Sequence, residues 1–200
     1  KSDEVLEALG LPTGHGYMSF IEAPYEGADV IVCRTGYTGE RGYELIVDNA
    51  VAARLWDAAL KAGAAYDILP CGLGARDTLR TEMGYPLHGQ DIGPEITPVQ
   101  AGIGWAVGWG KPEFSGRSKL LAEREAGPKV RLRGLLAQGR GIPRPEMSVR
   151  LTRDLPIGQV TSGTFSPTLR KGIALALINS QIQDGAEVSV DIRGRQEIFV

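Results

Sequence analysis

The sequence predicts a mixed α+β fold in two parts: an α+β domain over residues 1–127 and a small antiparallel β-barrel over residues 128–200. Two observations lead to this division. In the first part, short alternating segments precede an amphipathic pattern at residues 50–62, as in strands covered by a helix. Beyond residue 129 the helical patterns stop, and short alternating runs separated by glycine and proline turns indicate a barrel or sandwich.

The composition is that of an ordinary globular chain. Hydrophobic residues make up 42% of the sequence and the net charge is −2, which argues against nucleic-acid binding driven by bulk charge. No apolar run approaches the roughly 20 residues that span a bilayer, and the opening residues 1–4 are polar, unlike a signal peptide. We therefore expect no nucleic-acid or membrane partner. Cys33 and Cys71 form no CxxC pair and are expected to be free, buried thiols in the cytoplasm or an organelle matrix.

The first elements follow from caps and alternation. Residues 2–9 predict a short helix that Ser2 caps and Gly10 ends, and His15 then lies in what we take as a surface loop. Strands are expected at residues 17–23, 29–33 and 42–47. Asp48 or Asn49 can cap the helix over residues 50–62, whose apolar stripe suits a sheet surface.

The segment RTGYTGERGYE, residues 34–44, is the most unusual turn in the chain. Three glycines allow backbone conformations and close approaches that other residues do not. In the strand that follows, Glu44 and Ile46 share one face, while Tyr43, Leu45 and Val47 share the other. Two interpretations stay open: a hairpin turn with one exposed glutamate, or one wall of a binding site.

A second informative segment, residues 72–84, predicts a helix. Gly72, Ala75, Leu79 and Met83 fall in one stripe that lets another backbone come close. Asp77 can pair with Arg80 at i+3, which leaves Arg76 without a local partner. Such an arginine either grips the anionic group of a ligand or forms a structural ion pair, for example with Glu44.

Residues 102–109 are rich in glycine and tryptophan. On a strand, Trp105 and Trp109 would share a face, where Trp105 could support a planar ring or pack in a core. His88 has no second histidine or cysteine near it, so no metal site is expected. No complete catalytic set is recognisable, and we assign no catalytic residue.

The remaining elements lead into the barrel. Residues 115–126 predict a surface helix that Ser115 caps and Gly127-Pro128 ends. Alternating runs then predict strands that include residues 130–136, 173–177 and 188–192. Arg193-Gly194-Arg195 predicts a hairpin turn before the last run.

Four segments together resemble aminomethyltransferase, the T-protein family of the glycine cleavage system. They are RTGYTGERGYE, LPCGLGARDTLRTEMGYPLHGQDI, TPVQAGIGWAV and GQVTSGTFSPTLRKGIALA. Each is weak alone, but they occur in the family's order and at its spacing. The match covers nearly the whole chain.

The resemblance implies the remainder of an α+β folate-binding domain followed by a C-terminal small antiparallel β-barrel. It also implies transfer of a methylene carbon from the aminomethyl-lipoyl arm of H-protein to tetrahydrofolate, with release of ammonia and without a metal. By resemblance, Glu44 is the pterin-binding glutamate and Arg76 the ligand-binding arginine. Tyr37 and Trp105 match aromatic residues that line the folate pocket.

The chain departs from the family in length, because family members exceed three hundred residues. The aspartate thought to position the reacting folate nitrogen would precede Lys1, so we expect these 200 residues alone to be inactive. Two alternatives remain: the folate-binding domain of another one-carbon enzyme, such as a dimethylglycine or sarcosine dehydrogenase, and a non-catalytic folate-binding module.

Overall fold

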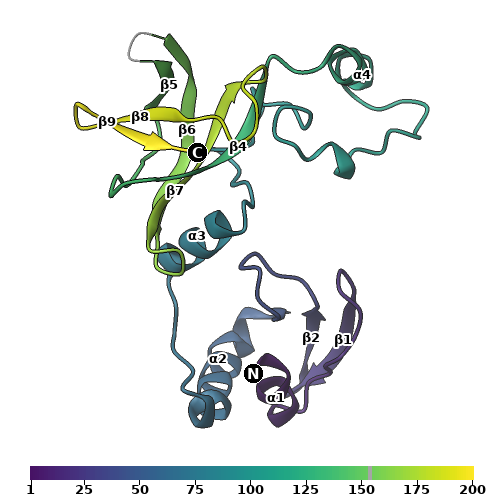
Figure 1. Ribbon diagram of the computed structural model, residues 1–200. Coiled ribbons are helices and arrows are strands. Elements are labelled where there is room, and N and C mark those ends of the chain that lie inside the picture. Colours follow the sequence, from purple (N-terminus) through teal and green to yellow (C-terminus); the bar gives the residue numbers. More distant parts are fainter. Residues whose placement is uncertain (153–154) are drawn as a thin grey trace. The chain divides into compact units, whose positions relative to one another are not determined.

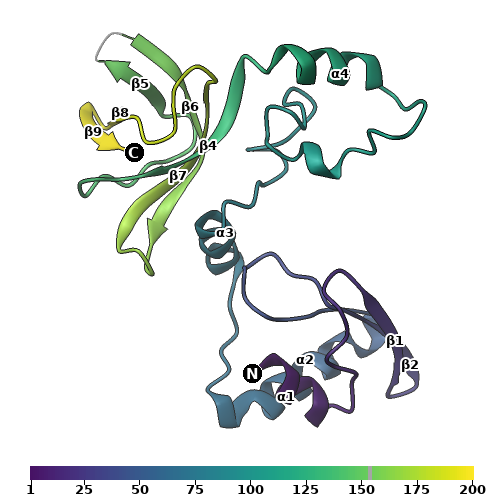
Figure 2. The ribbon, with the colours of Figure 1, turned by 45° about the vertical axis from the view of Figure 1, so that its right-hand side comes forward.

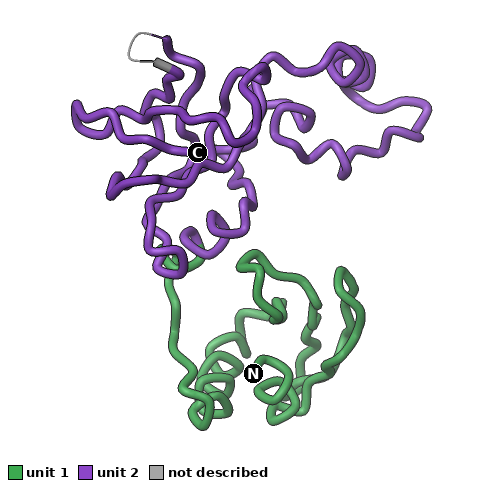
Figure 3. Tube along the Cα trace, in the orientation of Figure 1, with its two compact units in different colours: residues 1–76 green, residues 77–200 purple. Residues whose placement is uncertain are grey.

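A computed structural model describes residues 1–152 and 155–200 of the protein and divides them into two compact units, residues 1–76 and 77–200 (Figure 3). The first contains α1 (Ser2–Ala8), β1 (Phe20–Tyr25), β2 (Ala28–Cys33), β3 (Glu44–Val47), α2 (Asn49–Gly63) and the 3-10 turn η1 (Ala64–Tyr66). The mixture of helices and strands confirms the predicted α+β class.

The first unit is a three-stranded antiparallel sheet with helices on one face (Figure 1). Its strand order is β1-β2-β3. Leu6 of α1 and Leu55 of α2 pack against Val30 and Val32 of β2, all of them buried. Asp48 caps α2 as predicted, because its Oδ1 accepts a hydrogen bond from the Ala50 N–H at 2.7 Å. The other face of the sheet is left without helices.

The second unit is built mainly on strands. Helix α3 (Leu73–Glu82) runs into it from the first unit, and the 3-10 turn η2 (Gly104–Ala106) and helix α4 (Arg117–Ala126) follow. Figure 2 shows α4 leading through a short connection into β4. The strands are β4 (Val130–Leu136), β5 (Ser148–Thr152), β6 (Leu155–Ser166), β7 (Lys171–Asn179), β8 (Val188–Ile192) and β9 (Arg195–Phe199).

These six strands form one antiparallel sheet in the order β4-β7-β6-β5-β8-β9. The two outermost strands meet where β4 ends. Leu136 N–H donates to Val200 O at 2.8 Å, Val200 N–H donates back at 3.0 Å, and Gln138 N–H donates to Ile198 O at 2.8 Å. The curled sheet encloses a core that includes Val149, Val160, Ala176, Val190 and Phe199. The predicted change from helices to antiparallel strands is therefore confirmed.

The turn between β8 and β9 was also predicted correctly. Arg193 and Gly194 have φ of 55° and 81°, so both central residues of this two-residue turn lie in the left-handed region. Gly194 N–H donates to Asp191 Oδ1 at 2.8 Å, which ties the turn to β8. This hairpin presents Arg193 and Arg195 to solvent.

The strand considered for Trp105 and Trp109 does not form. Residues 104–106 form the 3-10 turn η2, and Trp109 Nε1–H donates to Gly104 O at 2.7 Å, which curls the segment back on itself. The side chain of Trp105 is 82% exposed, whereas Trp109 is half-buried beneath the Arg124 guanidinium. The two indoles therefore share no strand face.

Two predicted helix caps are also absent. Helix α1 has Lys1 as its N-cap and no side-chain cap bond, because the Ser2 hydroxyl donates instead to Arg41 O at 3.1 Å. Helix α4 begins after Gly116, whose φ of 82° makes the entry, so Ser115 does not cap it.

The surroundings of His15, Cys71 and Gly72 differ from those expected. His15 is half-buried: its Nε2 lies 3.0 Å from Val32 O, and its ring centroid lies 5.5 Å from that of Tyr43. Cys71 is exposed, since it lies on the extended segment before α3, while Cys33 is half-buried and both thiols are free as predicted. A side chain at Gly72 would meet open space, so no backbone packs closely there.

Candidate functional site

Glu44 lies at the start of β3 on the helix-free face of the first sheet. Strand pairing aligns Phe20, Cys33 and Glu44 in one row and Glu22, Ile31 and Ile46 in another on the same face. We call these six residues the outer face. Its apolar members include Phe20 and Ile46, whose side chains are 62% and 58% exposed. A carboxylate thus stands on an open, largely apolar surface, as the alternation predicted.

The glycine-rich turn holds this carboxylate. The loop of residues 34–43 joins β2 to β3 and places Thr35 beside Glu44, and the Thr35 hydroxyl donates a short hydrogen bond to Glu44 Oε2. Tyr43, the residue before Glu44, lies on the opposite face of the strand, where two hydrogen bonds hold its hydroxyl. The Tyr43 hydroxyl donates to Asp3 Oδ1 at 2.6 Å and accepts from the Gly14 N–H at 3.0 Å.

The pKa values of Asp3 and Arg41 are both shifted near this turn. The hydrogen bond from Tyr43, followed by the nearby charge of Arg41, lowers the pKa of the Asp3 carboxyl below its ordinary value of 3.8, although partial desolvation opposes this. Arg41 Nη2 lies 2.6 Å from Asp3 Oδ2, on the surface. This cluster could not be read from a local pattern, because Asp3 and Tyr43 are forty positions apart.

Arg76 and Tyr37 come together in the first unit. The Arg76 guanidinium lies 4.8 Å from the centroid of the Tyr37 ring, a cation–π contact that leaves the planar fork free to bind an anion. Within residues 1–152 and 155–200, neither Glu44 nor Arg76 belongs to an ion pair, so the structural Glu44–Arg76 pair considered above is not observed. Trp105 belongs to the second unit.

A charged cluster at Arg80 was missed by sequence reasoning. Arg80 and Asp91 are 1% and 0% exposed, and Arg80 Nη1 lies 2.7 Å from Asp91 Oδ2. Arg80 Nη2 donates to Asp77 Oδ1 at 2.6 Å, the pair that was predicted, and to Ser162 Oγ of β6 at 2.8 Å. Asp91 also accepts from the Leu87 N–H and the Ser162 hydroxyl, each at 2.8 Å. The cluster ties the end of α3 to the barrel sheet.

Residues 1–152 and 155–200 contain neither a candidate metal cluster nor a membrane-spanning helix. Among the described residues, no group of three or more histidine, cysteine, aspartate or glutamate side chains could hold an ion. No helix in the same ranges is long and apolar enough to cross a bilayer. The candidate site presents the Glu44 carboxylate beside an apolar surface and the exposed Arg76 guanidinium.

The fold places the chain in a class of solved proteins. It resembles the crystal structure of glycine cleavage system aminomethyltransferase T from Bartonella henselae, with a TM-score of 0.88 and 32% sequence identity. The match covers 98% of this chain and 54% of that one. This chain thus shares its fold with about half of a glycine cleavage system aminomethyltransferase.

Family models and curated relatives agree. Residues 1–111 match the GCVT N-terminal domain, and residues 131–198 match the glycine cleavage T-protein C-terminal barrel domain. The chain belongs to the glycine cleavage T-protein family.

Two curated relatives are both named aminomethyltransferase. The protein from Frankia alni is 61% identical over 191 residues, covering 96% of this chain and 52% of the relative. The protein from Mycobacterium tuberculosis strain H37Rv is 57% identical over 196 residues, covering 97% of this chain and 53% of the relative. The chain spans about half the length of the curated relatives it matches.

Proposed function

We propose that this chain supplies the tetrahydrofolate-binding wall and the barrel of an aminomethyltransferase of the glycine cleavage system. One observation carries the proposal: Glu44 is held by Thr35 on the exposed, largely apolar outer face rather than being used in an ion pair. A pterin ring has a flat apolar body and an edge with an amino group next to a ring N–H. A carboxylate beside an apolar surface is complementary to both.

We assign folate contacts to Arg76, Tyr37 and Trp105 that suit the chemistry of their side chains. Arg76, stacked on Tyr37, pairs with an anionic or carbonyl group of the folate, and Tyr37 packs against the ligand. Trp105 is an exposed indole that can pack against a planar ring. These assignments are supported by residue type and exposure, and no residue of this chain is assigned a catalytic role.

The proposed reaction needs a second substrate. The aminomethyl group on the lipoyl arm of H-protein gives its methylene carbon to tetrahydrofolate, which becomes 5,10-methylenetetrahydrofolate, while ammonia and dihydrolipoyl H-protein leave. The relatives are bacterial, and bacteria have no organelle matrix, so we place this reaction in the cytoplasm.

We also propose a domain boundary at residues 127–128, which is supported by the family matches that end at residue 111 and resume at residue 131. The names of the relatives do not favour the dehydrogenase alternative.

Calorimetric titration with tetrahydrofolate tests the binding role. Glu44→Ala is expected to weaken binding by about 1–3 kcal/mol, because the ligand's N–H groups lose their acceptor. Glu22→Ala is the matched control, since Glu22 is an exposed carboxylate on the same face in the neighbouring row. Equal affinity of the wild type and Glu44→Ala, or an equal loss in both variants, would contradict the assignment.

The transfer reaction is tested on the protein at the full length its gene encodes. Aminomethylated H-protein and tetrahydrofolate are supplied, and ammonia and methylenetetrahydrofolate are measured together. Equal amounts of the two products are expected. Tetrahydrofolate binding without either product would leave a non-catalytic folate-binding module as the function.

A further inference from the structure

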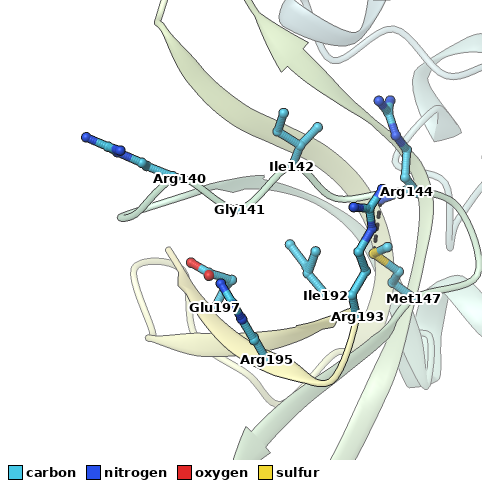
Figure 4. Close-up of a pocket in the computed structure, with 9 residues that line it drawn as sticks. All are labelled: Arg140, Gly141, Ile142, Arg144, Met147, Ile192, Arg193, Arg195 and Glu197. Atoms are coloured by element: carbon cyan, nitrogen blue, oxygen red, sulfur yellow. Dashed lines mark hydrogen bonds between the residues drawn. The ribbon is translucent and has the colours of Figure 1, made fainter.

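The barrel contains a second candidate site, separate from the residues assigned to folate. A cavity of about 520 Å³ lies between the loop after β4 and the β8–β9 hairpin (Figure 4). Its charged lining consists of Arg140, Arg144, Arg193, Arg195 and Glu197. Four arginines and one glutamate give these side chains a net charge of +3, in a chain whose total charge is −2. Positive charge is therefore concentrated here.

Three of these arginines make no polar side-chain contact with the described part of the chain that would stabilise the fold. Within the described ranges, Arg140, Arg193 and Arg195 take part in no ion pair or side-chain hydrogen bond, whereas Arg144 Nη1 donates to Gly163 O at 3.3 Å. Like charges gathered on a surface repel one another, so the grouping brings the fold no stabilisation of its own. Arg193 also occupies a left-handed turn position at φ 55°, where glycine, asparagine or aspartate is favoured. The arrangement is better explained by an anionic ligand.

The loop that forms one wall of the cavity is closely packed. A side chain on Gly172 of β7 would place its Cβ 2.0 Å from Gly141 O, and one on Gly141 would lie 2.8 Å from atoms of Ile192 and Glu197. The loop thus packs closely on β7, β8 and β9. Figure 4 shows Arg193, Arg195 and Glu197 rising from the hairpin toward the loop that carries Gly141 and Ile142. Sites that need little ordering on binding lose less affinity to entropy.

The lining also indicates the kind of ligand. Ile142, Ile192 and Met147 provide apolar surface next to the arginines, and the volume lies in the range of about 300–1,000 Å³ that is typical of small-molecule sites. Planar guanidinium groups bind carboxylate and phosphate oxygens in pairs. We propose that this cavity binds a small anion that carries two or more acid groups.

The test uses citrate and pyrophosphate as separate probes in calorimetric titrations of the whole chain at constant ionic strength. Saturable binding of at least one probe, with a Kd below about 1 mM, is expected. Whichever of citrate and pyrophosphate binds more tightly shows whether the site prefers carboxylates or phosphates. No saturable binding of either probe overturns the proposal.

Three variants locate the binding. Arg193→Gln combined with Arg195→Gln should weaken it by about tenfold or more, because charged hydrogen bonds are lost. Arg131→Ala, which removes an exposed arginine on β4 outside this cavity, should leave it unchanged. Glu197→Gln should tighten it by about threefold, since the single carboxylate in the lining is neutralised.

The third variant keeps the test independent of folding, because a misfolded protein does not gain affinity. An equal loss in Arg131→Ala and the double variant overturns the site, as does unchanged or weaker binding by a folded Glu197→Gln protein. Tetrahydrofolate binding is measured in parallel. An intact folate site with no anion binding would remove this proposal and leave the proposed function standing.

Discussion

The two sheets of this protein cover the apolar faces of their alternating strands in different ways. The three-stranded sheet packs one face on α1 and α2 and leaves the outer face open, with Glu44 at its edge. The barrel sheet curls until β9 meets the end of β4 and encloses its apolar face. Elsewhere in the second unit, the buried Arg80 and Asp91 form an ion pair. The Glu44 carboxylate of the first sheet is therefore available for binding, whereas the buried Arg80–Asp91 pair of the second unit stabilises the fold.

The largest expected effect follows from this difference. Arg80→Met leaves the Asp91 carboxylate buried without its partner and should lower the free energy of unfolding by about 3–5 kcal/mol. Urea unfolding measures the change. Arg131→Ala removes an exposed arginine and should change stability by less than about 0.5 kcal/mol. A loss below about 1 kcal/mol for Arg80→Met would show that the cluster is not a structural support.

Close packing in the barrel gives the next largest effect. Gly172→Ala places a Cβ 2.0 Å from Gly141 O and should destabilise the protein by about 1–3 kcal/mol, since backbone must shift. Gly134→Ala in β4 is the matched control, because a Cβ there meets open space. If both variants unfold at the same urea concentration, the loop is not packed as described.

A substitution at Arg76 should affect binding and not stability. Arg76→Lys keeps the charge but loses the planar fork, so tetrahydrofolate affinity should fall by about 1 kcal/mol or more while the urea midpoint stays unchanged. Calorimetry and urea unfolding of one protein preparation measure both. A stability loss without an affinity loss would make Arg76 a structural residue.

The smallest expected effect depends on pH. Because the pKa of Asp3 is lowered in the folded state, its contribution is present above pH 3.8 and is lost as the pH falls below that value toward the folded pKa. Tyr43→Phe removes the hydrogen bond to Asp3 and should lower the Tm slightly near neutral pH. The difference from wild type should shrink in strong acid. Tyr66→Phe serves as the control, and a difference that grows on acidification would contradict the assignment.

Local signals predicted most elements of the fold. Alternation found β2, β3 and β8, the amphipathic pattern and Asp48 found α2, and the Arg193-Gly194 pair found its hairpin turn. The face occupied by Glu44 followed from the period of the strand alone. These features could be predicted because neighbouring residues determine them.

Contacts between distant residues were not predictable in the same way. Asp91 lies eleven residues from Arg80, a separation that carries no periodic signal, and Ser162 is further away still. The segment around Trp105 is curled by the hydrogen bond from Trp109 Nε1–H to Gly104 O and does not form the strand considered for it. In each case the outcome depends on three-dimensional packing and not on the local pattern.

The sequence by itself thus determined the α+β class, the glycine-rich turn and the face on which Glu44 stands, because backbone sterics and side-chain alternation act over a few residues. Only the tertiary structure decided which of two arginines on one helix is buried: Arg80 meets Asp91, while Arg76 lies over Tyr37 at the surface. It also brought four arginines around one barrel cavity. Burial and charge pairing are properties of the folded chain, since they require partners that only folding brings within reach.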